Sequence, residues 1–115
     1  MVCFIGCNSL INAPNIYFPN VVTFSNMFSN CVRLRNVPEY NASKVYNMGM
    51  MFRYCNNLSN TSIQNIINMC LNSDIPASNK NLSTSNYSSP FYDTKFYNVY
   101  YSNRLAELNA AGWKY

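Results

Sequence analysis

The segment MFSNCVRLRN at residues 27–36 returns 24 residues later as MFRYCNNLSN at residues 51–60. The same spacing reaches back to CFIGCNSLIN at residues 3–12. Four positions are identical in all three copies: Phe (Phe4, Phe28, Phe52), Cys (Cys7, Cys31, Cys55), Leu (Leu10, Leu34, Leu58) and Asn (Asn12, Asn36, Asn60). Four identities at one spacing are a specific signal of an internal repeat. A repeat constrains the fold more strongly than any local pattern, so it is interpreted first.

Each copy places its apolar residues in steps of three with one adjacent pair. In the second copy these residues are Val21, Phe24, Met27, Phe28, Cys31 and Leu34. This spacing predicts a helical or 3₁₀ turn with one apolar side, followed by a short strand that Pro38 ends. One unit cannot bury its apolar stripe alone, whereas stacked units bury it continuously. The sequence therefore predicts an α/β fold, a short solenoid of 24-residue units in which Phe lies over Phe and Cys over Cys.

The repeat units resemble those of the BspA-like leucine-rich repeat family, in the variant that reads roughly V-x-N-M-x-x-M-F-x-x-C-x-x-L. Residues 45–58, VYNMGMMFRYCNNL, fit this pattern nearly position by position. The resemblance covers residues 1–60. It implies a leucine-rich-repeat-like solenoid in a surface-exposed, non-catalytic protein of bacteria or some protists, or in a bacteriophage virion protein. The family assigns no catalytic residues.

The expected organisation has two parts. Residues 1–60 hold the repeats, as units 1–14 (partial), 21–38 and 45–61, and residues 61–115 form a helical and aromatic C-terminal cap with a loop at 72–90. Because the first unit begins at Met1 in mid-repeat, it is either a truncated terminal unit or the edge of a longer array, and we favour the longer array.

Two helices are expected in the cap. Thr61 or Ser62 is expected to cap the first helix. Its apolar face is predicted to hold Ile63, Ile66, Ile67, Cys70 and Leu71. The second helix begins near Asn103 and stops at Gly112, after which Trp113 folds back onto the end of the stack.

The cysteines are interpreted as core residues. Cys7, Cys31 and Cys55 share one repeat position beside Phe and Leu, where a buried free thiol behaves as a small hydrophobe. Stacked units would point their Cβ atoms the same way, which disfavours a disulfide. A metal site at Cys3 and Cys7 lacks any histidine and any second cysteine pair, so no metal and no cofactor are predicted.

No catalytic residues are assigned, and we expect the chain not to be an enzyme. The chain has no histidine, which removes the commonest general base. Its four acidic residues, Glu39, Asp74, Asp93 and Glu107, are far apart in sequence, so a carboxylate pair could form only through the fold.

Candidate binding residues come from two groups. The aromatic segment contributes Tyr92, Tyr97, Tyr100 and Tyr101, which serve either as core of the cap or as a stacking platform for a sugar or a partner protein. Arg33 and Arg35 belong to a loose basic group in a chain of net charge +4, which we interpret as solvated charge and not as a nucleic-acid surface. No apolar run approaches the roughly 20 residues of a membrane span, so no membrane insertion is expected.

The leading functional hypothesis is a structural or recognition module of a phage virion, in a tail, fibre or head decoration. Its partners would be protein or a surface glycan, within a larger assembly or a longer chain. The alternative is an adhesin on the bacterial cell surface that binds host protein or glycan. Fold alone does not separate these two roles.

Overall fold

The computed structural model describes most of the repeat region and both helices of the C-terminal half. The residues described are 4–16, 20–76, 79–80 and 102–113. The candidate residues Tyr92, Tyr97, Tyr100 and Tyr101 lie outside the described residues, as do Cys3 and most of the predicted loop 72–90.

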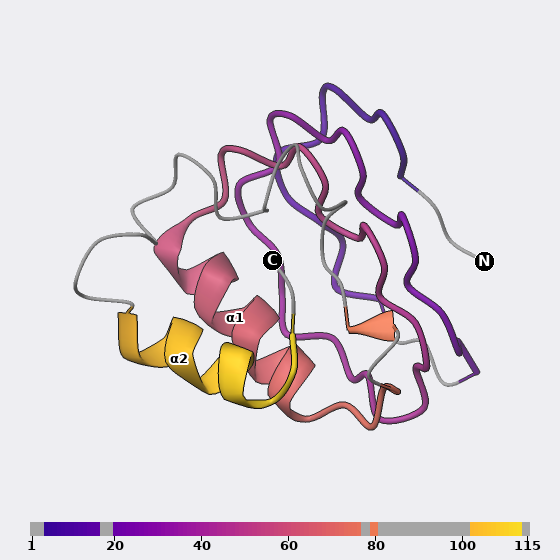
Figure 1. Cartoon of the computed structure of the whole chain (residues 1–115). Helices are drawn as coiled ribbons and strands as arrows, with labels where there is room; N and C mark the ends of the chain where they lie inside the picture. The colour runs from indigo at the N-terminus through magenta and orange to yellow at the C-terminus, as the bar shows by residue number, and fades with distance from the viewer. Residues whose placement is uncertain (1–3, 17–19, 77–78, 81–101, 114–115) are drawn as a thin grey trace.

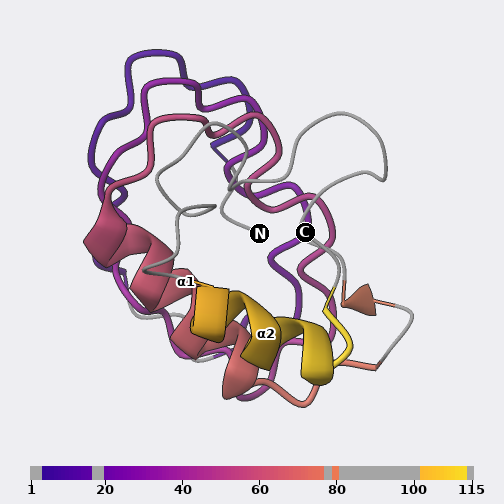
Figure 2. The same ribbon diagram turned by 60° about the vertical axis from the view of Figure 1, so that its left-hand side comes forward.

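The repeat region follows three irregular layers, which run side by side in Figure 1 and Figure 2. We call residues 4–16 layer 1, residues 20–40 layer 2 and residues 44–59 layer 3. Backbone hydrogen bonds join each layer to the next. Phe4 N–H donates to Met27 O at 2.8 Å, and Phe28 N–H donates to Met51 O at 2.9 Å. Equivalent backbone groups are therefore paired along the 24-residue repeat.

Side chains at equivalent positions lie on one another. The Phe4 and Phe28 rings stack with centroids 5.4 Å apart, and the Phe28 and Phe52 rings stack at 5.7 Å. At the exposed edge, the Asn36 side-chain amide donates to Asn12 Oδ1 at 2.6 Å. The prediction that like side chains stack on like is confirmed for these residues.

The predicted fold class, an α/β leucine-rich-repeat-like solenoid, is wrong. The described part of the chain is compact, with two short helices and no β-strand. The predicted strand is reduced to single parallel bridges, Asn12–Asn36 and Thr23–Asn47, which do not extend into ladders. The predicted helical or 3₁₀ turn is present in the layers only as isolated turns, which are closed by i→i+3 hydrogen bonds such as Cys31 N–H to Phe28 O at 3.1 Å.

Left-handed residues explain why neither regular structure forms. Gly6, Asn30 and Tyr54 share one repeat position and have φ of 69°, 64° and 64°. Asn26 and Met50 share another and have φ of 60° and 58°. A residue in the left-handed region ends both a right-handed helix and a strand. Layers 2 and 3 each contain two such residues, four positions apart. The chain therefore bends before a helix or a strand can extend.

Helix α1 (Asn60–Leu71) closes the last layer. It begins two to three residues earlier than predicted, because the cap is Ser59, whose Oγ accepts from Ser62 N–H at 3.1 Å. Its buried apolar residues are Ile63, Ile66, Ile67, Met69 and Cys70. Leu71 was predicted on this face but is 37% exposed.

Helix α2 (Ser102–Ala110) packs against α1 on the side away from layer 1. The helix is stopped by Gly112, two residues after its end, which has φ of 88°. Trp113 N–H donates to Leu108 O and Gly112 N–H donates to Asn109 O, both at 3.0 Å, which is the hydrogen-bond pattern of a Schellman motif. The Trp113 side chain is buried, as predicted.

One hydrophobic core serves the layers and both helices. Its members run from Phe24 in layer 2 to Leu108 and Trp113 at the C-terminal side. Phe4, Cys7 and Leu10 of layer 1 are only partly buried and pack against this core from one side. Burial therefore increases from layer 1 towards the helices.

Candidate functional site

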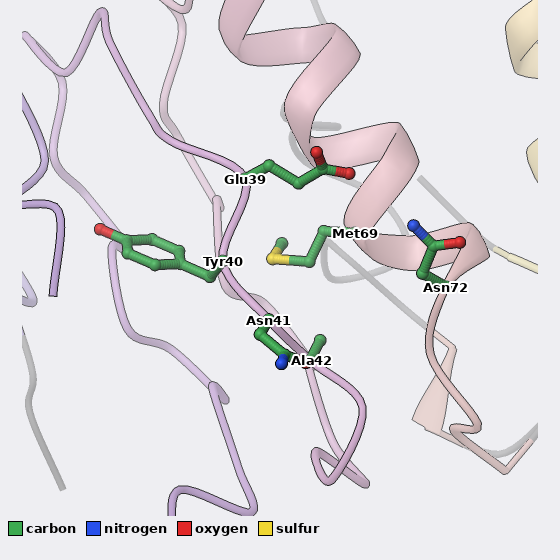
Figure 3. A pocket seen from close by; sticks show the side chains of 6 residues that line it. All are labelled: Glu39, Tyr40, Asn41, Ala42, Met69 and Asn72. Atoms are coloured by element: carbon green, nitrogen blue, oxygen red, sulfur yellow. The ribbon is translucent and has the colours of Figure 1, made fainter. Parts of the chain in front are cut away.

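A hollow of about 300 Å³ lies between the loop of residues 37–43, which includes the end of layer 2, and the last turn of α1. Its walls are formed by Glu39, Tyr40, Asn41, Ala42, Met69 and Asn72 (Figure 3). We call it the 39–72 pocket. None of these residues was a candidate from the sequence, because the loop and the helix end meet only in the folded chain.

The loop wall is fixed by Tyr40, whose ring points away from the pocket into the core. The ring lies 6.0 Å from that of Phe24 and 6.3 Å from that of Phe28, measured between centroids. Its hydroxyl donates to Pro14 O at 2.6 Å. Burial raises the pKa of Tyr40 to about 12. Tyr40 therefore holds the loop in place and offers no ring face to a ligand.

Hydrogen bonds to α1 fix the start of the same loop, and a hydrogen bond within the loop fixes its turn. Val37 N–H donates to Ser62 Oγ, and the Asn65 side-chain amide donates to Val37 O, both at 2.8 Å. Asn41 Oδ1 accepts from Ser43 N–H at 3.0 Å, which makes a tight Asx turn around the buried Ala42. The loop is thus anchored on both sides of Glu39.

The helix wall is the C-terminal end of α1. Met69 is buried and forms an apolar floor with Ala42. Asn72 caps the helix with its backbone N–H, which donates to Asn68 O and Cys70 O, while its side chain is exposed. The last turn of α1 contains no basic residue. No side chain of that turn therefore neutralises the negative end of the helix dipole.

Glu39 is the one carboxylate among the residues that line the pocket. The loop carries its side chain towards α1 (Figure 3), and the residue is exposed. General acid–base catalysis or glycoside hydrolysis would need a second group beside it. A single carboxylate with two amides and an apolar floor is suited to binding a ligand.

The predicted residues Arg33 and Arg35 lie in layer 2 with exposed side chains, and they do not line the pocket. The backbone of Arg35 joins three segments. Its N–H donates to Ile11 O at 2.8 Å, and its carbonyl accepts from Ser59 N–H at 2.8 Å and from Ser62 Oγ at 2.7 Å. The structure thus assigns a packing role to the main chain of this residue.

The cysteines form a ladder of thiols inside the layers. Cys31 Sγ donates to Phe4 O at 2.8 Å, and Cys55 Sγ donates to Phe28 O at 3.0 Å. Both residues are buried, as predicted, and neither forms a disulfide, while Cys7 is only partly buried. Burial raises the pKa of the Cys55 thiol to about 12, and the Cys31 sulfur adds to the rise. Such thiols are poor nucleophiles near neutral pH.

The described residues show neither a metal-binding cluster nor a membrane-spanning helix. No group of three or more His, Cys, Asp or Glu side chains is arranged to hold a metal ion there. Neither α1 nor α2 is long and apolar enough to cross a membrane.

Comparison with known proteins adds no family assignment, because no family model, curated protein or solved structure matches the chain.

Proposed function

We propose that the chain is a non-catalytic structural and recognition module of a phage virion, in a tail, fibre or head decoration. In this role it contacts other virion proteins or the host surface. The observation that carries the proposal is the Phe28 ring, which is stacked between Phe4 and Phe52 at 5.4 and 5.7 Å. Rings, thiols and backbone groups joined from layer to layer make a stiff body, which suits a spacer or a presenting scaffold.

The state of the cysteines supports assembly in a reducing compartment. Cys31, Cys55 and Cys70 are buried cysteines that form no disulfide. Proteins that fold in the cytoplasm keep their thiols reduced, whereas small exported domains are commonly joined by disulfides. Virion proteins are made and assembled in the host cytoplasm, so buried cysteines that form no disulfide fit that origin better than export.

The resemblance of residues 45–58 to BspA-like repeat units adds a second line of support. That family includes virion proteins and bacterial surface proteins and assigns no catalytic residues. The 39–72 pocket fits a recognition role, because its wall has one carboxylate and no second acid or base.

Fractionation of a culture that carries the gene tests the proposal. Particles released from the culture are banded on a density gradient, and peptides of this chain are quantified by mass spectrometry in the particle band and in the cell envelope. The proposal expects the peptides in the particle band, at a constant ratio to a capsid protein. Peptides confined to the cell envelope would favour the surface adhesin and contradict the virion role.

A further inference from the structure

We propose that the 39–72 pocket binds one cationic side chain, a lysine or an arginine, from a partner protein. The inference rests on the proposed recognition role and names the chemistry of the partner. Three features of the pocket support this inference: its negative charge, its shape, and the lack of an aromatic ring face that a ligand could stack on.

The charge of the pocket is negative from both walls. Glu39 contributes a carboxylate from the loop. The C-terminal end of α1 contributes the negative end of a helix dipole, with no basic residue in its last turn. In the part of the chain that the structure describes, Arg104 and Glu107 form an ion pair at 3.2 Å, and Glu39 forms none.

The shape suits a long side chain with a charged end. Met69 and Ala42 are buried and form the apolar floor, and Glu39, Asn41 and Asn72 form the exposed polar rim. Lysine and arginine pack their methylene stems on apolar surface and keep the charged group at a polar edge. A volume of about 300 Å³ is at the low end of ligand pockets and is enough for one such side chain.

A sugar is less well matched to these walls. Protein sites for sugars commonly offer an aromatic ring as a stacking platform, since such a ring has an apolar face and a polar edge. Tyr40 is the one aromatic residue of the wall, but its ring packs against Phe24 and Phe28 and its hydroxyl is bonded to Pro14 O. An anionic ligand would meet Glu39 and the negative helix end.

Titration of the ¹⁵N-labelled full chain with small probes, followed by two-dimensional NMR, tests the inference. The probes are Nα-acetyl-lysine amide and Nα-acetyl-arginine amide. Nα-acetyl-norleucine amide serves as the uncharged control, and N-acetylglucosamine as the sugar control. We expect saturable shifts from at least one cationic probe, confined to residues 39–42 and 69–72. We expect binding to weaken with added salt.

Two variants separate the carboxylate from general surface charge. Glu39→Gln keeps the shape of the side chain and removes its charge, and it should weaken binding of the cationic probe by about two- to fivefold, as expected for an exposed ion pair. Asp74→Asn removes an exposed charge outside the pocket wall and should leave binding unchanged. Because Glu39 is exposed, the substitution should not unfold the chain, and the spectrum itself checks this.

Several outcomes would overturn the inference. These are the absence of shifts with both cationic probes, equal binding of the norleucine probe, full binding by Glu39→Gln, or binding of the sugar alone. The outcome of the fractionation experiment does not depend on the outcome of this titration. A chain absent from particles whose pocket still binds a cationic probe would remove the virion role and leave the pocket assignment standing.

Discussion

The Cys55 thiol donates a hydrogen bond across layers to the carbonyl oxygen of Phe28, 3.0 Å away. Cys31 makes the same contact to Phe4 one layer earlier, at 2.8 Å. The repeated cysteine thus adds a directed bond between layers to its apolar packing. This explains chemically why cysteine suits the position, since its size fits a dry interior and its S–H satisfies a backbone acceptor.

Replacing Cys31 with serine should lower stability. Cys31→Ser replaces the thiol with a hydroxyl, which is more polar and is held on a C–O bond shorter than the C–S bond. We expect a loss of about 1–3 kcal/mol in the free energy of unfolding. Cys7→Ser is the matched control at the same repeat position in layer 1. Because Cys7 is only partly buried, its loss should be below about 0.5 kcal/mol. Urea unfolding measures both, and equal losses would contradict the burial difference between the two layers.

Relieving backbone strain at Met50 should raise stability. Met50 has φ of 58°, in the left-handed region, where the equivalent residue of layer 2 is Asn26 with φ of 60°. Asparagine tolerates this region far better than methionine. Met50→Asn should therefore stabilise the chain by about 0.5–1 kcal/mol in thermal or urea unfolding. Met50→Ala keeps a Cβ without that tolerance and serves as the control. A gain with alanine as large as with asparagine would argue against strain relief.

Stability should fall at alkaline pH. Burial raises the pKa of Cys55 from 9.0 to about 12 and that of Tyr40 from 10.0 to about 12. The folded chain therefore keeps protons that the unfolded chain releases, so the stabilisation is complete below pH 9 and is lost as the pH rises towards 12. Each group contributes at most about 1.4 kcal/mol per pH unit.

Urea unfolding at a series of pH values from neutral to alkaline checks this dependence. Cys55→Ala removes one of the groups and should show a shallower loss of stability across the same range. A wild-type stability that stays constant up to pH 11 would show that these groups are not buried in the folded chain.

The repeat made much of the core predictable. A spacing of 24 residues correctly placed Phe4, Phe28 and Phe52 in one stack and Cys31 and Cys55 in the interior. Side-chain identity at a fixed spacing reports which residues stack, and this holds whatever backbone conformation lies between them.

The backbone conformation was not predictable from the same pattern. Steps of three were interpreted as a helical or 3₁₀ turn, but residues such as Asn30 and Tyr54 take positive φ and limit it to isolated turns. Asparagine and glycine at this repeat position gave a signal for such breaks, whereas Tyr54 gave none.

The pocket was also not predictable from the sequence. Glu39 and Asn72 are far apart along the chain, and they meet because Ser62 and Asn65 of α1 bind the backbone of Val37. No local pattern marks such a meeting. Leu71 shows the opposite error, since helical periodicity placed it on the buried face of α1 while the last turn leaves it 37% exposed.

The most direct test of the central claim is a set of nuclear Overhauser contacts between phenylalanine rings in a selectively labelled sample. Single Phe→Leu variants at residues 4, 28 and 52 assign the signals. Stacked layers predict cross-peaks from Phe28 to both Phe4 and Phe52, whose rings lie 5.4 and 5.7 Å from it, and none between Phe4 and Phe52. A direct Phe4–Phe52 cross-peak, or no cross-peak from Phe28 to either ring, would contradict the account.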